Sequence, residues 1–189
     1  FLVNMERYVE HLEHWLADCP DQRLFKWDNM TDVTPFEPEY DASRLLVEDF
    51  AAREGKFLEI YVGKSANVEH LLPLAHDGHT ILQWSVAGQS QVNRFEPRTA
   101  RRDERIEAAR ACQDAGYLVR FRLSPIIPVR NWRQETAELV DRIFDRTAPD
   151  VISLCALGWM DWDPARNCLD LSALDPDFVE AMRSAAPFL

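Results

Sequence analysis

The stretch FLEIYVGKSANVEHLL, residues 57–72, decides the fold class. Its first six residues form an apolar run that is typical of a buried strand. Gly63, Lys64 and Ser65 follow at once, and a short helix interrupted by Pro73 is predicted over residues 66–75. A strand that passes directly into a helix is the unit from which parallel sheets are built.

The alternation of strand and helix continues on both sides of this stretch. Four further strands are predicted, at residues 23–27, 80–86, 117–127 and 151–157. Helices are predicted between Asn4 and Pro20, and at about 42–53, 100–115, 132–147 and 175–186. Five strands interleaved with helices imply parallel βαβ units, which form a doubly wound sheet or a (β/α) barrel.

Both architectures place their working residues at the carboxyl ends of the strands. Polar residues recur at successive predicted strand ends, and these are the candidate site residues: Asn29, Thr31, Asp32, Lys64, Ser65, Ser85, Ser124 and the segment after Leu157.

Composition restricts the function classes. A chain of 189 residues is one domain or most of one, and its net charge of −11 argues against a simple nucleic-acid coat while leaving room for a local basic groove. No apolar run approaches the ~20 residues that a membrane span requires. The four cysteines, Cys19, Cys112, Cys155 and Cys168, form no C-x-x-C pair, so no zinc knuckle or disulfide framework is indicated. We expect a cytoplasmic protein, and a fragment, because the chain begins at Phe1 inside the approach to a helix.

The Gly-Lys-Ser triplet is not a phosphate-binding loop. That loop needs a glycine five positions before the Gly-Lys pair, and Leu58 occupies this position inside the strand. Lys64 therefore remains as a cation at a strand end. It can hold a ligand's carboxylate or phosphate, or pair with a neighbouring acid.

The other polar clusters are weaker signals. The histidines fit surface positions, and no G-x-S-x-G, G-x-G-x-x-G or H-E-x-x-H motif is present. A basic cluster has two interpretations, a helix start offset by nearby acids or a contact for a polyanion. Its members are Arg98, Arg101, Arg102, Arg105, Arg120 and Arg122.

A more specific pattern runs from Lys64 to Trp132. Its elements K-x-x-x-V-x-H-L-L, N-x-F-E-x-x-T, R-x-x-A-A, A-G-Y and P-I occur in this order. In order and spacing the segment resembles the spore photoproduct lyase family of radical S-adenosylmethionine (AdoMet) enzymes. Weaker similarity extends over roughly residues 2 to 158.

The resemblance implies an α/β fold, a partial (β/α)6 TIM-like barrel of the radical SAM type that here lacks its first strand. It also implies AdoMet and a [4Fe–4S] cluster as cofactors, a 5′-deoxyadenosyl radical that abstracts hydrogen from the substrate, and an electron donor such as flavodoxin or ferredoxin. On this chain, Lys64 falls where the family places a lysine toward the methionyl carboxylate. Ser85 matches a serine near the same ligand, Ser124 borders the adenine, and Thr31 and Asp32 lie on the cofactor side.

This sequence departs from the family pattern at three points, which limit how far the family's properties can be expected of this chain. The cluster-binding C-x3-C-x2-C motif is absent, which we attribute to truncation, so the ligand cysteines are expected upstream. Asn29 stands at the closest match to the family's hydrogen-donating cysteine, which argues against repair by the lyase's own route. Arg98 replaces the glycine of the family pattern F-E-P-G-T, and we expect a different turn geometry there.

The resulting hypothesis is a lyase-like radical SAM enzyme fragment with an unknown substrate, for which damaged DNA is one candidate. Residues 1–158 would form the partial barrel, strands two to six, and residues 159–189 an extension of the same domain. One alternative is an ordinary (β/α)-barrel lyase or aldolase in which Lys64 is a Schiff-base or phosphate-binding residue, which would require a buried lysine. The other is a non-catalytic barrel fragment.

Overall fold

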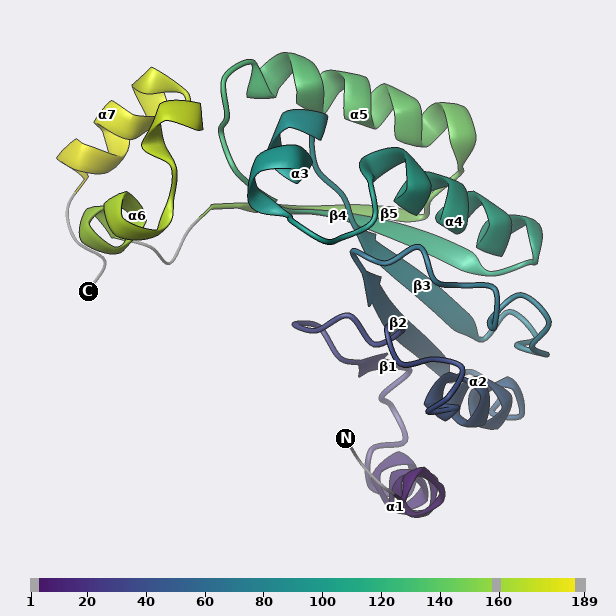
Figure 1. Ribbon diagram of the computed structural model, residues 1–189. Coiled ribbons are helices and arrows are strands. Elements are labelled where there is room, and N and C mark those ends of the chain that lie inside the picture. The colour runs from purple at the N-terminus through teal and green to yellow at the C-terminus, as the bar shows by residue number, and fades with distance from the viewer. Residues whose placement is uncertain (1–3, 158–160, 186–189) are drawn as a thin grey trace.

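The structure, a computed structural model, describes residues 4–157 and 161–185. Five parallel strands lie side by side in chain order: β1 (Leu24–Trp27), β2 (Phe57–Gly63), β3 (Thr80–Ser85), β4 (Leu118–Ile126) and β5 (Val151–Ala156). The sheet curls into a half-barrel with helices on its outer side, as Figure 1 shows. The predicted α/β partial barrel is confirmed, and all five strands fall within one residue of their predicted bounds.

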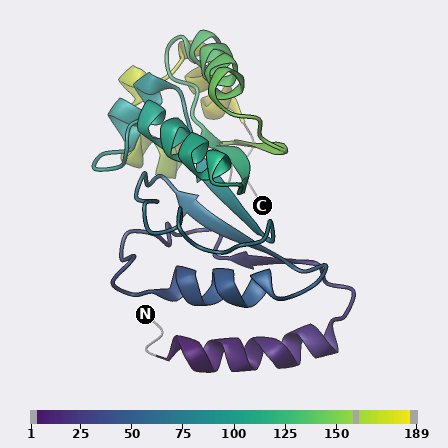
Figure 2. The same cartoon turned by 90° about the vertical axis from the view of Figure 1, so that its right-hand side faces the viewer.

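Seven α-helices are described, and five of them accompany the strands: α1 (Met5–Asp18), α2 (Ala42–Ala51), α3 (Gln89–Phe95), α4 (Arg102–Asp114) and α5 (Trp132–Arg146). Helices α1 and α2 lie side by side next to the β1–β2 end of the sheet (Figure 2). The last two, α6 (Trp162–Cys168) and α7 (Pro176–Ser184), stand at the far end of β4 and β5 with a short 3-10 turn (Leu171–Ala173) between them. None of the helices in the described ranges is both long and apolar enough to cross a bilayer.

The main core lies between the sheet and its helices. Side chains alternate between the two faces of a strand, and one set on the central strands is buried against the helices: Leu58, Ile60, Val62, Leu82, Trp84, Val119 and Phe121. The opposite set, which includes Glu59, Tyr61, Gln83 and Arg120, faces the concave side. Polar residues in the middle of buried strands therefore belong to the interior of the half-barrel.

The prediction of a helix over residues 66–75 is wrong. This segment consists of successive turns in which Val68 and Leu71 accept hydrogen bonds from residues three positions later. Pro73 lacks an N–H and disfavours helical geometry at the preceding residue. The side-chain amide of Asn67 instead donates to the carbonyls of Thr34 and Glu37, at 2.9 Å each, and ties the segment to the loop after β1.

A second, smaller core joins the C-terminal helices to the end of β4. Ile127, Val129 and Leu174 are buried there, and Val129 forms an isolated antiparallel bridge with Leu174. The expected boundary between residues 158 and 159 lies outside the described residues, as does part of the candidate segment after Leu157, so this division stays a prediction.

Candidate active site at the carboxyl ends of the strands

The end of β2 requires glycine at position 63. Gly63 has φ +72°, a conformation that L side chains rarely adopt. A Cβ atom there would lie 1.8 Å from Oδ1 of Asp32, so the carboxylate occupies the space that a side chain would need. The other carboxylate oxygen of Asp32 accepts a hydrogen bond from the N–H of Lys64 at 3.0 Å. The Gly-Lys pair thus serves a close approach between two loops at the sheet edge.

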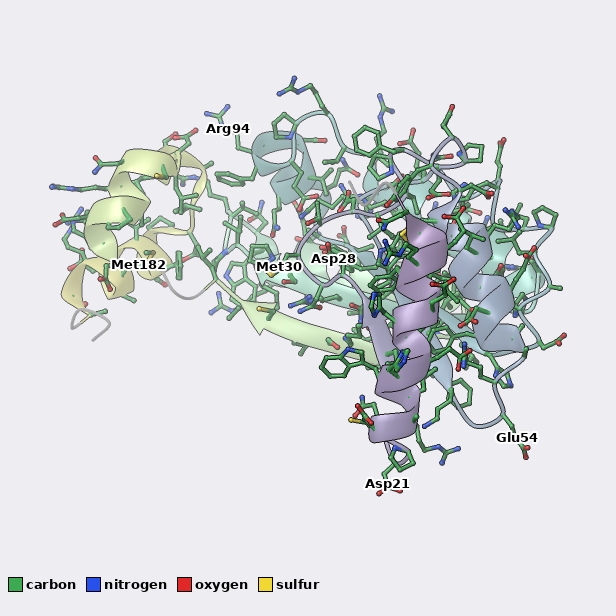
Figure 3. The ribbon with its side chains drawn as sticks, turned by 90° about the horizontal axis from the view of Figure 1, so that it is seen from below. Asp21, Asp28, Met30, Glu54, Arg94 and Met182 are labelled. Carbon is green, nitrogen blue, oxygen red and sulfur yellow. The ribbon has the colours of Figure 1, made fainter. Side chains whose placement is uncertain are left out.

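The loop after β1 delivers Asp32 to this point. Asp28 lies in the left-handed region, with φ 62°, and its Oδ1 accepts hydrogen bonds from the N–H groups of Asn29, Met30 and Thr31 at 2.5, 2.6 and 3.0 Å. These bonds, that from Met30 above all, lower the pKa of Asp28. In the view from below, Asp28 and Met30 mark this loop (Figure 3). Its backbone is therefore organised by one carboxylate before Asp32 is reached.

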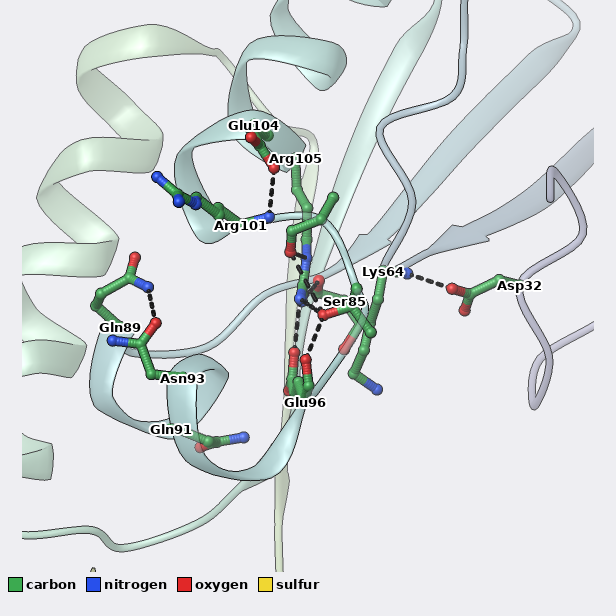
Figure 4. A network of polar contacts seen from close by, with 12 residues as sticks. Asp32, Lys64, Ser85, Gln89, Gln91, Asn93, Glu96, Arg101, Glu104 and Arg105 are labelled. Carbon is green, nitrogen blue, oxygen red and sulfur yellow. Dashed lines mark hydrogen bonds and ion pairs between the residues drawn. The ribbon is translucent and has the colours of Figure 1, made fainter.

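The side chain of Lys64 runs away from Asp32 and past Ser85 (Figure 4). Within residues 4–157 and 161–185, its ammonium group has no hydrogen-bond acceptor and no ion-pair partner. It is partly exposed, not sealed in an apolar pocket. A cation held at a strand end without a partner is suited to a ligand's carboxylate or phosphate. The buried lysine that the aldolase alternative requires is not found.

Ser85 and Ser124 meet across the ends of β3 and β4. The fully buried hydroxyl of Ser85 donates to the carbonyl oxygen of Ser124 at 2.9 Å. Tyr61, on the concave face of β2, lies beside this pair. Burial raises the pKa of Tyr61, while the Ser85 hydroxyl and the charge of Arg122 lower it and the charge of Asp32 raises it. Tyr61 therefore contributes a neutral phenol to the concave face near Ser85.

A buried arginine fixes the end of β3. Arg105, fully buried on α4, forms an ion pair with Glu96 at 2.7 Å and donates to the carbonyls of Ser85 and Ala100 at 3.0 and 2.8 Å. The Nη2 atom that pairs with Glu96 also donates to the hydroxyl of Thr99 at 2.8 Å. Figure 4 shows Arg105 between Ser85 and Glu96. These contacts explain the spacing of N-x-F-E-x-x-T and R-x-x-A-A. Each motif supplies one side of the same buried network.

The polyanion-contact interpretation is wrong for three of the six members of the arginine cluster, which are engaged within the chain. Arg105 is buried, Arg102 pairs with Asp103 at 3.0 Å, and Arg120 pairs with carboxylates on the concave side. Arg98 has φ 64°, a left-handed conformation that glycine would adopt without strain. Whether this turn differs from that of the family pattern stays a prediction.

The concave face has a charged floor below the site. Glu59, 3% exposed, pairs with Lys26 at 2.6 Å and with Arg120 at 2.5 Å. Arg120 also pairs with Asp150 at 2.8 Å. Two cations and two carboxylates therefore neutralise one another across β1, β2 and β4. Glu59 and Arg120 lie in the first halves of β2 and β4, before the strand ends that carry the candidate site residues.

Of the candidate site residues, the structure pairs Asp32 with Lys64 and Ser85 with Ser124 at the same edge of the sheet. Thr31 is exposed in the loop before Asp32. Sequence reasoning missed Tyr61 and the role of Arg122, which donates to the side-chain oxygen of Asn29 at 2.8 Å. The two-residue period of a strand would have found both, because it places them on the same face as the strand-end residues.

The four cysteines do not fit an iron–sulfur cluster. Cys112 is buried, and burial raises its pKa to about 12, whereas cluster ligands are thiolates. Cys19 and Cys168 are exposed on α1's end and on α6, and Cys155 lies on β5. Over the part of the chain that the structure describes, no three His, Cys, Asp or Glu side chains are grouped so as to hold a metal ion.

The family model and the curated relatives that match this chain agree on one family. The family model described as spore photoproduct lyase matches residues 1–155. Curated spore photoproduct lyases from a Geobacillus species and from Bacillus subtilis are 37% and 26% identical, over 75% and 79% of this chain. These alignments cover 41% and 44% of those proteins, so the chain spans about two fifths of the length of the curated relatives it matches.

Solved structures of spore photoproduct lyase share the fold. A double mutant with bound AdoMet and dinucleoside spore photoproduct superimposes with a TM-score of 0.77 at 23% identity, covering 89% of this chain and 53% of that one. A second, complexed with dinucleoside spore photoproduct, has a TM-score of 0.73 at 23% identity, covering 80% and 46%.

Proposed function

Because the chain belongs to the spore photoproduct lyase family, we propose that it forms the substrate- and cofactor-facing part of a lyase-like radical S-adenosylmethionine enzyme. The observation that carries the proposal is the Lys64 ammonium, which stands at the end of β2 with no partner in the described chain. It lies at the sheet edge where ligands bind in folds of this kind.

The residues at this edge fit AdoMet. Lys64 would hold the methionyl carboxylate, because its ammonium group is free and partly exposed. The Ser85 hydroxyl donates its hydrogen bond to the carbonyl oxygen of Ser124. These two residues would therefore border the ligand with a hydroxyl oxygen and a backbone oxygen. The N–H donors that converge on Asp28 hold the loop in place, and Thr31 and Asp32 would close the cofactor side.

When bound, AdoMet supplies hydrogen-atom abstraction by its 5′-deoxyadenosyl group. The partner cluster in such chemistry is [4Fe–4S], with a flavodoxin or ferredoxin as electron donor. No cysteine arrangement of this chain fits the cluster, and no step is assigned to it. The chain's own contribution is to bind, to orient and to exclude water at the concave face.

We propose a dinucleoside lesion in DNA as the substrate class, as in the relatives whose structures contain dinucleoside spore photoproduct. DNA as substrate also implies a cytoplasmic location. Asn29 has no thiol, and its side-chain oxygen is engaged by Arg122. The reaction would therefore end by a route that does not take hydrogen from position 29.

The test is a carboxylate-specific binding experiment on this chain. Wild type and Lys64→Met are titrated calorimetrically with AdoMet and with decarboxylated AdoMet, which lacks the group that Lys64 would hold. A hydrogen bond between charged groups contributes about 1.5–3 kcal/mol, so Lys64→Met should weaken AdoMet binding about tenfold to a hundredfold. Binding of decarboxylated AdoMet should hardly change.

Arg133→Gln is the matched control, because Arg133 is an exposed cation that stacks on Trp132, 4.6 Å from the ring centre, and lies on α5. If Lys64→Met weakened the binding of AdoMet and of decarboxylated AdoMet equally, a contact between Lys64 and the carboxylate would be contradicted. Absence of AdoMet binding by the wild-type chain would contradict the proposal and favour a non-catalytic fragment.

A further inference from the structure

Arg122 spans the concave face of the half-barrel. It lies on β4 in register with Ser85, and its Nη1 donates to Oδ1 and to the backbone oxygen of Asn29 at 2.8 and 3.3 Å. Asn29 belongs to the loop after β1, and two strands separate β1 from β4 in the sheet. The guanidinium group therefore lies across the interior, above the charged floor and at the level of the strand ends.

Over residues 4–157 and 161–185, no carboxylate forms an ion pair with Arg122. Its neighbour two residues earlier, Arg120, has two carboxylate partners, Glu59 and Asp150. Arg122 has only the neutral oxygens of Asn29 among the described residues. Burial raises the pKa of Tyr61 on the same face, and the charge of Arg122 acts against this rise. The carboxylate of Asp32 at the same level is already engaged by the N–H of Lys64.

The unused side of the guanidinium is the one that recognises oxyanions. Within the described chain Nη1 makes the two contacts with Asn29, and neither Nε nor Nη2 of Arg122 donates to any acceptor. The Nε–Nη2 edge presents two parallel N–H groups that match two oxygens of a phosphate or carboxylate. Asn29 thus fixes one end of the group and leaves the bidentate edge free.

We propose that Arg122 binds the phosphodiester that joins the two nucleosides of the substrate. This rests on the proposed function for the substrate class, and Lys64 is assigned there to the cofactor carboxylate. Within a DNA strand, one anionic phosphodiester joins the two nucleosides of such a lesion, whose bases are neutral, so a single unneutralised guanidinium fits it in charge and in number of donors. Arg122 is then a specificity-determining residue, and Asn29 is the residue that positions it.

The experiment uses this chain and three probes: the dinucleotide thymidylyl-thymidine, free thymidine and AdoMet. Arg122→Gln should weaken thymidylyl-thymidine binding about tenfold or more, because a charge-assisted bidentate contact is lost. Binding of thymidine and AdoMet should stay within about twofold, within the scatter expected for sites without contact. Inorganic phosphate should compete with thymidylyl-thymidine in the wild type and lose this effect in Arg122→Gln.

Two further variants separate the contact from general damage. Asn29→Ala keeps the charge but releases its anchor, and a loss smaller than that of Arg122→Gln is expected. Arg133→Gln should match the wild type. Urea unfolding of each variant verifies that the fold is retained.

Unchanged thymidylyl-thymidine affinity in Arg122→Gln, or no binding by the wild type, overturns the assignment of Arg122. Equal losses of AdoMet and dinucleotide also overturn it, because they would place Arg122 in the cofactor site. The effect of Lys64→Met on AdoMet affinity tests the proposed function separately.

Discussion

Replacement of Gly63 by alanine tests the central contact of the site. The new Cβ would lie 1.8 Å from Oδ1 and 2.3 Å from Cγ of Asp32, far inside van der Waals contact. The alanine would also have to adopt φ +72°. Both strains act at the same point, where β2 ends and the N–H of Lys64 donates to Asp32.

The expected cost can be estimated from these terms. A left-handed conformation costs alanine roughly 1–2 kcal/mol, and the stiffer unfolded chain returns roughly 0.5–1 kcal/mol. Relief of the clash requires the Asp32 carboxylate to move, which breaks a charge-assisted hydrogen bond of roughly 1.5–3 kcal/mol. Gly63→Ala should therefore lower the free energy of unfolding by about 2–4 kcal/mol, as measured by urea denaturation with an unchanged slope.

Gly78→Ala is the matched control. Gly78 has φ +73°, but nothing lies within 4 Å of the position its Cβ would take. Only the backbone term applies, so a loss of about 1 kcal/mol or less is expected. In an Asp32→Ala background, Gly63→Ala should also fall to about 1 kcal/mol. Equal costs at positions 63 and 78 in the wild-type background would refute the argument that Asp32 occupies the missing side chain's space.

Three further predictions concern the loops around the site. Arg98→Gly should raise the thermal midpoint by a few degrees, about 0.5–1 kcal/mol, because it removes left-handed strain at φ 64°; a lower midpoint would contradict this. Arg105→Met should destabilise the chain by about 3–5 kcal/mol, since it leaves Glu96 buried without its partner. The double change with Glu96→Gln should cost less than Arg105→Met alone, and a cost equal to the sum of the single changes would argue against coupling. The folded-state pKa of Asp28 is lowered, so the stabilisation that the Asp28 carboxylate contributes is present above the usual aspartate pKa and is lost as the pH falls below about 4. Asp28→Ala should remove this acid-dependent part of the unfolding free energy. An unchanged pH profile of stability between pH 3 and 5 would contradict the contact.

The sequence by itself determined the architecture. Apolar runs such as 57–62 and the spacing of the helices specify parallel βαβ units, because burial on both faces of a sheet leaves a pattern that is local in the chain. The strand-end rule placed Asp32, Lys64, Ser85 and Ser124 at one edge, where they lie. The same local reasoning failed at residues 66–75, where contacts of Asn67 with a loop thirty residues earlier outweigh a weak helical pattern.

Only the tertiary structure decided which partner each charged side chain has. Arg105, Arg120 and Arg122 look alike in the sequence, yet one is buried with Glu96, one belongs to the neutral floor and one keeps a free edge. The side chains of Glu96, Asp150, Glu59 and Asn29, with which they pair, lie 9 to 93 positions away, and no local pattern encodes such pairings. Gly63 shows the same division, because its place after a strand is visible in the sequence, whereas the carboxylate of Asp32 that requires it comes from another loop.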